Sequence, residues 1–350
     1  MTDEVITDVK EEKKGNIVSV GLDVGTMHLC CARSDSKNLK ITRNVFLPVE
    51  KDDVSINQLS NISYVESADG ETFIIGSDAF EFANIFGKEV SRPMEKGLIS
   101  PKEISAIDVL TLMLKDLIGD TKDKEVYCSY SIPAEAIDEG RSITYHENVF
   151  ARILNSLGVN HTSVNEGMAI IYSECAKENF GGIAISFGAG MANVVVAYKG
   201  VEALKFSTAR AGDWIDRQVS KDLDMVPNRV TNIKEKYMKL TGAVDVKNKK
   251  TRRVLEALFY YHKALIEYTV KKIIKEFEEK VDIEVDEGIP IVISGGTSLP
   301  EGFLDLFKNI ITSQELPFEV SEIRMARNPL TAVANGLLVR TMADVKDMGK

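Results

Sequence analysis

The sequence predicts an α/β fold built from two similar halves, and three observations support this prediction. The first is a pair of β-branched apolar runs, residues 17–26 and 183–196, each broken by a glycine-containing turn. The second is that apolar residues flank both turns, as in a β-hairpin whose glycines let a ligand approach the backbone. The third is the alternation of strand-like and helix-like segments after each hairpin, which favours layers around a central sheet. We therefore expect two turns that face one polyphosphate from opposite sides.

Length and charge indicate a soluble protein of two domains. With 350 residues, the chain exceeds the size of about 250–300 residues at which a single core stops growing. Its formal net charge of −10 argues against a general nucleic-acid-binding protein. The single basic run, residues 247–253, is interpreted as a solvated loop or a helix start.

Cysteine usage and the N-terminal segment indicate a cytoplasmic protein without a membrane anchor. The four cysteines do not have the spacing of a disulfide framework, so we expect reduced thiols. No stretch approaches the ~20 consecutive apolar residues of a membrane span. Residues 1–14 contain neither the apolar core of a signal peptide nor an amphipathic anchor, and we expect a disordered tail there.

The later elements of the first half are predicted from apolar periodicity and turn residues. In order, they are a strand within 40–48, a strand at 73–76, a helix at 77–86, a loop at 92–99, a largely buried helix at 104–118, a strand at 126–132 and a helix over most of 134–157. Pro133 stops the last strand, because proline lacks the amide hydrogen that a sheet ladder needs. Gly158 is expected to end the last helix.

The second half repeats this arrangement without repeating the sequence. Its expected elements are a strand at 159–164, a helix at 168–178, the hairpin from 183, a third strand at 203–206, helices at 214–223, 229–239 and 254–279, a strand at 289–293, a helix from 301, a further strand and a final helix at 330–342. Trp214 is interpreted as a core residue. Ligands in such folds lie where loops leave the strand ends, which here is between the two halves.

Two of the turns have the residues that a nucleotide site needs. In the first, backbone N–H groups of Gly25 to His28 can meet phosphate oxygens, and Asp23 can hold Mg²⁺ through water. In the other, residues 294–298, a glycine pair between strand and helix lets a nucleotide lie against the backbone. Each turn by itself is also compatible with an ordinary hairpin or strand–helix loop. His28, a lone histidine on a turn, is interpreted as an incidental neighbour.

Glu166 lies between a short strand and a helix. A carboxylate there can orient or deprotonate a water that attacks a terminal phosphate. The alternative is an acidic residue that interacts with the positive end of the helix dipole. In the second turn, Ser186 stands at the place that Asp23 has in the first.

Taken together, these motifs resemble the actin superfamily, the ATP-binding fold of actin, sugar kinases and heat-shock ATPases. The resemblance covers roughly residues 16–342, with the motifs in the family's order. Similar segments are the first phosphate loop at 21–26, the second at 187–190, the adenosine helix at 233–236 and the adenosine loop at 292–298; residues 92–99, 211–213 and 328–334 resemble the bacterial actins MreB and MamK.

The resemblance implies that the chain binds ATP or ADP with Mg²⁺. Asp23 would lie beside the metal, and Glu166 together with Asp23 would serve hydrolysis by positioning the attacking water. The residues implied to contact the nucleotide are Gly25, Thr26, Met27, His28, Ser186, Gly188, Ala189, Gly190, Met191, Gly212, Asp213, Lys234, Glu235, Gly295, Gly296, Thr297 and Ser298.

The second phosphate loop departs from the family's pattern. The family normally has an aspartate where this chain has Ser186, and the threonine pair of the bacterial proteins is replaced by Met191 and Ala192. A hydroxyl can hydrogen-bond a metal-bound water, but it adds no negative charge. Nucleotide binding with slow hydrolysis is therefore expected.

The resemblance also implies two actin-like domains and a cytoskeletal function. The expected divisions are a disordered tail at 1–15, a first domain at 16–160 with a small subdomain inserted at about 40–95, a second domain at 161–342 and a tail at 343–350. The implied function is a cytoplasmic ATPase that polymerises head-to-tail, because contacts that do not close give open filaments. The chain itself is the expected partner, with a cargo adaptor as a further candidate and no direct contact with nucleic acid.

Two other functions stay open at this point. Ser186 favours a non-polymerising, chaperone-like or reactivase-like switch with weak or absent hydrolysis. A small-molecule kinase would need a catalytic base at a sugar-binding cleft, and the sequence shows no such constellation.

Overall fold

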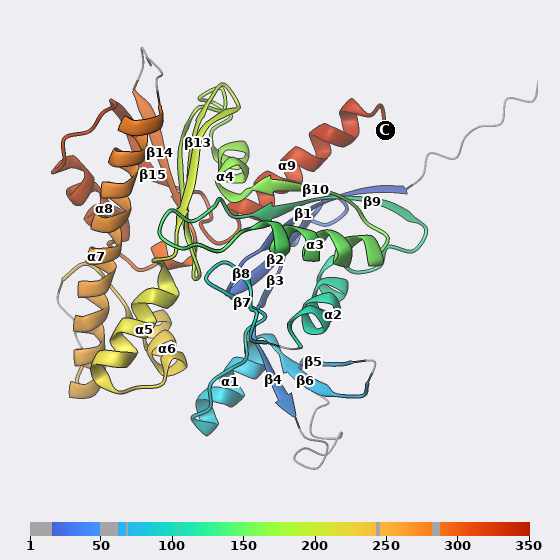
Figure 1. The fold of residues 1–350 in the computed structure, drawn as a ribbon, viewed down its shortest axis with the longest axis horizontal. Helices are drawn as coiled ribbons and strands as arrows, with labels where there is room; N and C mark the ends of the chain where they lie inside the picture. The colour runs from blue at the N-terminus through green and yellow to red at the C-terminus, as the bar shows by residue number, and fades with distance from the viewer. Residues whose placement is uncertain (1–15, 50–61, 68, 104, 243–245, 282–287) are drawn as a thin grey trace, which may run out of the picture.

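Two five-stranded sheets with the same strand arrangement form the centre of the molecule (Figure 1). The computed structural model describes residues 16–49, 62–67, 69–103, 105–242, 246–281 and 288–350. The first sheet has the order β10-β9-β1-β2-β3 and consists of β1 (Asn16–Val24), β2 (His28–Arg33), β3 (Lys40–Arg43), β9 (Lys124–Ile132) and β10 (Asn160–Asn165). The second has the order β13-β12-β11-β14-β15 and consists of β11 (Gly182–Phe187), β12 (Ala192–Tyr198), β13 (Val201–Thr208), β14 (Ile289–Ser294) and β15 (Val320–Met325).

The two sheets match strand for strand. In each, a hairpin supplies two antiparallel strands (β1–β2 or β11–β12) with a third antiparallel strand beyond it. In each, the first strand of the hairpin also pairs in parallel with a strand on its other side (β9 or β14). The two turns therefore leave equivalent positions of equivalent sheets. The predicted α/β fold with two similar halves is confirmed.

Two smaller sheets accompany the first one. The antiparallel sheet β4-β6-β5, made of β4 (Phe46–Val49), β5 (Tyr64–Glu66) and β6 (Thr72–Ile75), carries helix α1 (Gly76–Phe86). At the lower edge of Figure 1 this unit lies near α5 and α6 of the other half. A two-residue hairpin, β7 (Met94–Glu95) with β8 (Leu98–Ile99), lies where the sequence predicted only a loop.

The remaining helices cover the two large sheets. They are α2 (Ala106–Ile118), α3 (Thr144–Ser156), α4 (Glu166–Glu174), α5 (Gly212–Leu223), α6 (Pro227–Tyr237), α7 (Lys249–Lys280), α8 (Phe303–Thr312) and α9 (Ala332–Asp347), with a 3-10 turn at Gly296–Ser298. Helix α2 turns Leu110, Met113 and Leu114 into the first core, as its dense apolar spacing predicts. Trp214, which was expected to be a core residue, is partly buried and packs against the second core. Among the described residues, no helix is both long and apolar enough to cross a bilayer.

Two predicted elements differ from the structure for reasons that lie outside their local sequence, whereas the basic run starts a helix, which is one of its two predicted interpretations. Residues 134–143 are not helical, because this segment pairs with β13: Ala136 bridges Ser207, and the Ile137 amide donates to the Ser207 carbonyl at 2.9 Å. The strand expected at 40–48 is two strands in different sheets. The basic run opens helix α7, with the Asn248 side chain accepting from the Lys250 and Thr251 amides.

The C-terminal end of the chain differs from the prediction. Helix α9 continues to Asp347 and Lys350 Nζ donates to Glu125 Oε1 at 2.6 Å, so the tail expected at 343–350 is largely helix packed on the first half. Strand β10 lies in the first sheet, so a boundary at residue 160 falls at the start of a strand of that sheet. The predicted tail at 1–15 lies outside the described residues.

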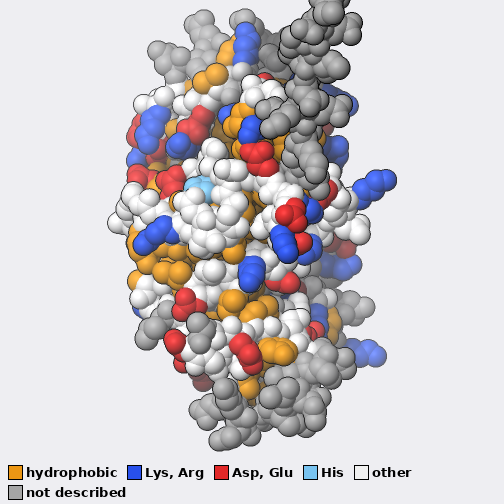
Figure 2. Space-filling view, turned by 90° about the vertical axis from the view of Figure 1, so that its right-hand side faces the viewer, with side chains coloured by type: hydrophobic (Ala, Val, Ile, Leu, Met, Phe, Trp, Pro, Cys, Tyr) orange, Lys and Arg blue, Asp and Glu red, His pale blue; other side chains and the backbone are white. Residues whose placement is uncertain are grey.

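Charged side chains are spread over the surface. On the face drawn in Figure 2, acidic and basic side chains are intermixed with small apolar groups. The net charge of −10 is therefore not gathered into one patch on this face. The four cysteines are buried thiols.

Helix α9 is held by backbone contacts that only glycine allows. A Cβ on Gly336 would clash with the Ala169 carbonyl oxygen of α4. A Cβ on Gly21 of β1 would clash with the Ala334 carbonyl oxygen and the Leu338 nitrogen of α9. The helix thus lies against an element of each half, and it fixes the two halves relative to each other.

Gly336→Ala is expected to destabilise the protein by about 1–3 kcal/mol, because the added methyl group forces α9 away from α4. Gly140→Ala is the matched control, since a Cβ on Gly140 meets no atom within 4 Å. Urea unfolding followed by circular dichroism measures both. Equal stability of the two variants would contradict the proposed close contact.

Candidate functional site

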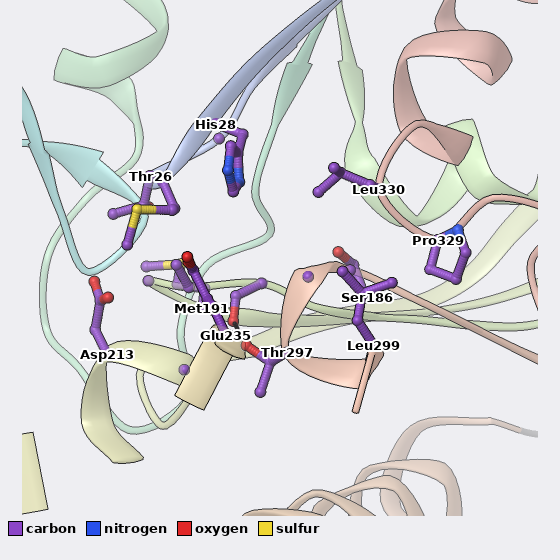
Figure 3. Close-up of a pocket in the computed structure, with 18 of the residues that line it drawn as sticks. Thr26, His28, Ser186, Met191, Asp213, Glu235, Thr297, Leu299, Pro329 and Leu330 are labelled. Carbon is purple, nitrogen blue, oxygen red and sulfur yellow. Dashed lines mark hydrogen bonds between the residues drawn. The ribbon is translucent and has the colours of Figure 1, made fainter. Parts of the chain in front are cut away.

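The glycine turns of both halves open onto one cavity of about 460 Å³ (Figure 3). The first turn follows β1, the second follows β11, and the third follows β14. Of the residues predicted for the site, those that line the cavity are Asp23, Gly25, Thr26, Met27, His28, Glu166, Ser186, Gly188, Ala189, Gly190, Met191, Gly212, Asp213, Lys234, Glu235, Gly295, Gly296 and Thr297. The structure therefore brings together side chains from both halves that are far apart in the sequence.

Ser298 is the one predicted residue that is not in the cavity wall. Its side chain is buried, and its hydroxyl donates to the Gly295 carbonyl at 2.7 Å within the 3-10 turn. This hydroxyl closes the turn instead of facing a ligand.

The first two turns meet through the β7–β8 hairpin. The amide of Gly97, at the tip of that hairpin, donates to Thr26 Oγ1 at 3.1 Å. A Cβ on Gly190 would clash with both the Gly97 nitrogen and Thr26 Oγ1, so the second turn packs directly against this pair. Met191 packs on Gly97 from the other side, and Figure 3 shows it near Thr26. The sequence prediction missed this hairpin as a structural link.

The second and third turns are joined by hydrogen bonds to backbone carbonyls. The Gly188 carbonyl accepts from Thr297 Oγ1 at 2.7 Å and from the Gly212 amide at 3.1 Å. The Asp213 amide donates to the Ala189 carbonyl at 2.8 Å. These bonds place the start of α5 and the third turn against the second turn, so one wall of the cavity is a single hydrogen-bonded unit.

Two carboxyl groups line the cavity, Asp23 near the end of β1 and Glu166 at the start of α4. Ser131 Oγ donates to Asp23 Oδ1 at 2.9 Å, and Asn193 Nδ2 donates to Glu166 Oε2 at 2.9 Å. Desolvation raises the pKa of both groups, and the nearby Asp23 charge raises the pKa of Glu166 further. In the ligand-free protein, the two carboxyls together therefore hold a proton more readily than free carboxyls do.

Asn165 explains why Glu166 points where it does. Its side chain accepts a hydrogen bond from the Gly167 amide at 2.9 Å and so starts helix α4 directly before Glu166. A Cβ on Gly167 would clash with Val195, so the first turn of α4 lies tightly on β12. Glu166 is thus fixed beside Asn193, which lies on β12 together with Val195.

Ion pairs cross the mouth of the cavity. Arg43 Nη1 contacts Glu235 Oε1 of α6 at 3.1 Å, and its guanidinium lies 4.4 Å from the centre of the Phe80 ring. Arg92 Nη1 contacts Asp213 Oδ1 of α5 at 2.7 Å. Both pairs join the region around the small sheet to the helices of the second half. Sequence reasoning identified Asp213 and Glu235 but not their partners, because only the tertiary structure reveals these pairs.

His28 and the apolar lining shape the remaining wall. Burial, with the charge of Arg43 as the second cause, lowers the pKa of His28 to about 4, so its imidazole is neutral at physiological pH. Leu299, Pro329 and Leu330 also line the cavity, and Figure 3 shows Leu299 and Pro329 farther from His28 than Leu330 is. His262 and Thr231 also line the cavity, and no local sequence signal pointed to either.

The metal-binding capacity of the site is limited to single carboxylates. Among the described residues, no group of three or more His, Cys, Asp or Glu side chains has a metal-binding arrangement. Mg²⁺ is commonly bound through one or two carboxylates together with substrate phosphates and water. Asp23, which lines the cavity, suits that kind of shared site.

Glu166→Gln is expected to stabilise the nucleotide-free protein at high pH. Because its folded-state pKa is raised, the Glu166 carboxyl favours folding at low pH, and this contribution is lost as pH rises through a folded pKa of about 8. Glutamine keeps an oxygen for Asn193 but cannot ionise.

In EDTA, the melting temperature of the wild type should therefore fall relative to that of the variant by a few degrees between about pH 5 and pH 9. Glu81→Gln, at an exposed carboxyl on α1, is the control and should follow the wild type. Parallel pH profiles for all three proteins would show that burial does not raise this pKa.

Known proteins share this fold over most of its length. The family model described as Volactin matches residues 18–341. The "MamK double helical filament" is 17% identical, covers 94% of this chain and 99% of its own, and has a TM-score of 0.69. MreB 5 of Spiroplasma citri bound to AMPPNP is 13% identical, covers 95% and 98%, and has a TM-score of 0.67.

A more distant likeness exists to an ethanolamine utilization protein. EutJ from Carboxydothermus hydrogenoformans is 15% identical, covers 92% of this chain and 89% of its own, and has a TM-score of 0.53. No curated protein matches the chain. The actin-like fold expected from the glycine turns is confirmed by these structures.

Proposed function

The chain belongs to the Volactin family, and we propose that it binds ATP or ADP with Mg²⁺ in the cavity, assembles head-to-tail into filaments and hydrolyses ATP slowly. The observation that carries this proposal is the convergence of three glycine turns, from two matching sheets, on one cavity. Backbone amides at such turns bind anionic phosphates, and a cavity of about 460 Å³ is within the range of small-molecule sites. The fold-related MreB 5 of Spiroplasma citri is described as bound to ADP and to AMPPNP, which supports a nucleotide as the ligand.

In this proposal each wall of the cavity meets a different part of the nucleotide. Gly25 to His28 and Gly188 to Met191 lie toward the phosphates, and Gly295 to Thr297 lie under the base and the α-phosphate. Gly212 and Asp213 lie toward the ribose, and Lys234 with Glu235 toward the adenosine. Asp23 would hold Mg²⁺ with phosphate oxygens and water, and the bound cation supplies positive charge that offsets the phosphates.

Hydrolysis is proposed to be slow because the water site lacks a second acid. Glu166, oriented by Asn193, is placed to hold a water for attack on the terminal phosphate. On the opposite strand Ser186 offers a hydroxyl to that water without adding charge. Met191, packed on Gly97, adds an apolar side chain next to the same space.

Assembly is proposed from the fold and from its relatives. We infer that the two halves act as two domains around the cavity and that identical molecules stack along one axis, as open head-to-tail contacts allow. MamK, which has the same fold, is described as a double helical filament. A cytoplasmic location and a cargo adaptor as a second partner belong to the same proposal.

Purified protein with ATP and Mg²⁺ should sediment as polymer above a critical concentration, and electron microscopy should show filaments. Protein with EDTA and no nucleotide is the control and should remain largely in the supernatant. Protein that stays monomeric with ATP over a wide concentration range would contradict the assembly part of the proposal.

A non-polymerising, nucleotide-dependent switch is the second candidate, and Ser186 is the observation that favours it. Such a protein would bind ATP tightly yet release phosphate no faster than a Glu166→Ala variant. Tight ATP binding, equal rates of phosphate release in the wild type and the Glu166→Ala variant, and the absence of filaments would support the switch and contradict the first proposal.

Ser186→Asp is expected to raise ATP turnover by about tenfold or more without abolishing assembly, because the new carboxylate can orient the attacking water and its metal. Phosphate release per minute measures the effect. Ser36→Asp, at an exposed serine far from the cavity, controls for added charge. Unchanged or lower turnover in the Ser186 variant would show that the serine does not limit hydrolysis.

A further inference from the structure

The end of the cavity away from the carboxyl pair has a polar inner wall. Helix α6 contributes Thr231 and Lys234 to it, and helix α7 contributes His262. Leu299 and Pro300, after the third turn, and Met238, after α6, supply apolar surface there. Polar groups at the end of an apolar slot are the arrangement by which proteins distinguish flat heterocyclic rings.

His262 carries a hydrogen-bond acceptor in this wall. Its Nδ1 lies 2.7 Å from the Leu258 carbonyl oxygen, which can only accept, so Nδ1 holds the hydrogen. Burial, with the charge of Lys234 as the second cause, lowers the pKa of His262 to about 3. The ring is therefore neutral, and Nε2 has a free lone pair.

That lone pair has no partner in the described part of the chain. His262 is completely buried, and its Nε2 makes no hydrogen bond with any described residue. Buried polar atoms in native proteins are nearly always paired. An unpaired buried acceptor in the wall of a ligand cavity therefore points to a donor that arrives with the ligand.

Lys234 contributes a donor to the same cavity wall. Its Nζ donates to Asp216 Oδ2 at 2.7 Å and lies 3.5 Å from the Gly212 carbonyl oxygen. An ammonium group has three hydrogens, and its charge acts on His262. The wall thus contains both a donor and an acceptor, which is the kind of pair that one edge of a base requires.

We propose that His262 Nε2, together with the Lys234 ammonium in the same wall, makes the site select adenine over guanine. The inference rests on the proposed nucleotide binding and specifies the base. Adenine presents an acceptor, N1, beside a donor, the 6-amino group, and so complements this wall. Guanine presents N1–H beside O6 and would set donor against donor and acceptor against acceptor.

Binding of diphosphates to the wild-type protein tests this pattern without hydrolysis. Calorimetry with ADP, GDP, inosine diphosphate and purine riboside diphosphate, each with Mg²⁺, gives four dissociation constants. We expect ADP to bind about tenfold or more tightly than GDP and inosine diphosphate. Purine riboside diphosphate, which lacks the 6-amino group, should bind with an affinity between these two levels. Equal binding of ADP and inosine diphosphate would overturn the inference but leave the proposed function intact. Binding of none of the four would overturn the proposed function and the inference with it.

Variants of His262 assign the effect to the residue. His262→Phe should weaken ADP binding by about tenfold and leave GDP binding within about twofold, so that the preference collapses. His262→Gln keeps an acceptor and should retain part of the preference. His146→Phe is the matched control, because His146 is also buried with an unpaired Nε2 but lies outside the cavity wall.

A folded His262→Phe protein with an unchanged ratio of ADP to GDP affinity would overturn the assignment to His262. Thermal melting establishes that each variant is folded. If His262→Phe does not fold, the analogue series on the wild type decides the proposal alone, because inosine diphosphate differs from ADP at the proposed edge.

Discussion

The contact between helix α9 and the two elements beneath it is the constraint on which the site depends. Gly21 lets β1 approach the backbone of α9, and Gly336 lets α9 approach α4. Strand β1 carries Asp23 near its end, and α4 begins with Glu166. The positions of the two carboxyls therefore depend on glycine contacts made at Gly21, on the same strand as Asp23, and at Ala169, in the same helix as Glu166.

The same helix also anchors the other turns and the first sheet. Thr341 Oγ1 accepts from the Ser129 amide at 2.9 Å, which ties α9 to β9. The segment before α9 holds the third turn, because the Pro329 carbonyl accepts from the Gly295 amide at 2.9 Å and from Ser294 Oγ at 2.8 Å. A displacement of α9 would therefore move the first turn, Glu166 and the third turn together, so the cavity behaves as one mechanical unit.

The sequence alone was sufficient for the features that local chemistry determines. Glycines between β-branched runs identified the turns, and the isolated acids Asp23 and Glu166 stood out because each adjoins a turn or a helix start. The sequence alone did not predict which distant segments pair with each other. Residues 134–143 pair with β13 instead of forming the predicted helix, and a local helical pattern gives no indication of that pairing. Ser298 illustrates the same limit, since its hydroxyl turns back onto the Gly295 carbonyl.

The sequence analysis missed Arg43 and His262 for the same reason. Arg43 and His262 lie within a strand and a long helix, where neither spacing nor neighbours distinguish them from residues with structural roles. Their positions matter because of what the fold brings opposite them: Glu235 for Arg43, and the cavity for His262. A buried polar atom without a partner can be recognised only after every other hydrogen bond has been assigned.

The ion pairs across the mouth bear on how a ligand and the shape of the molecule influence each other. Arg43–Glu235 is partly exposed, and pairs of that kind contribute only about 0–1 kcal/mol. Arg92–Asp213 is more buried on its acidic side, but breaking it exposes both charges to water, which offsets much of the loss. The two pairs thus join the halves across the cavity with only a small net contribution to the free energy of unfolding. In the proposed function, a polyphosphate would contact turns from both halves at once, and a ligand favours one arrangement over another only by its difference in affinity for them. We therefore propose that a nucleotide bound to turns of both halves stabilises the arrangement that helix α9 sets more than these two ion pairs do.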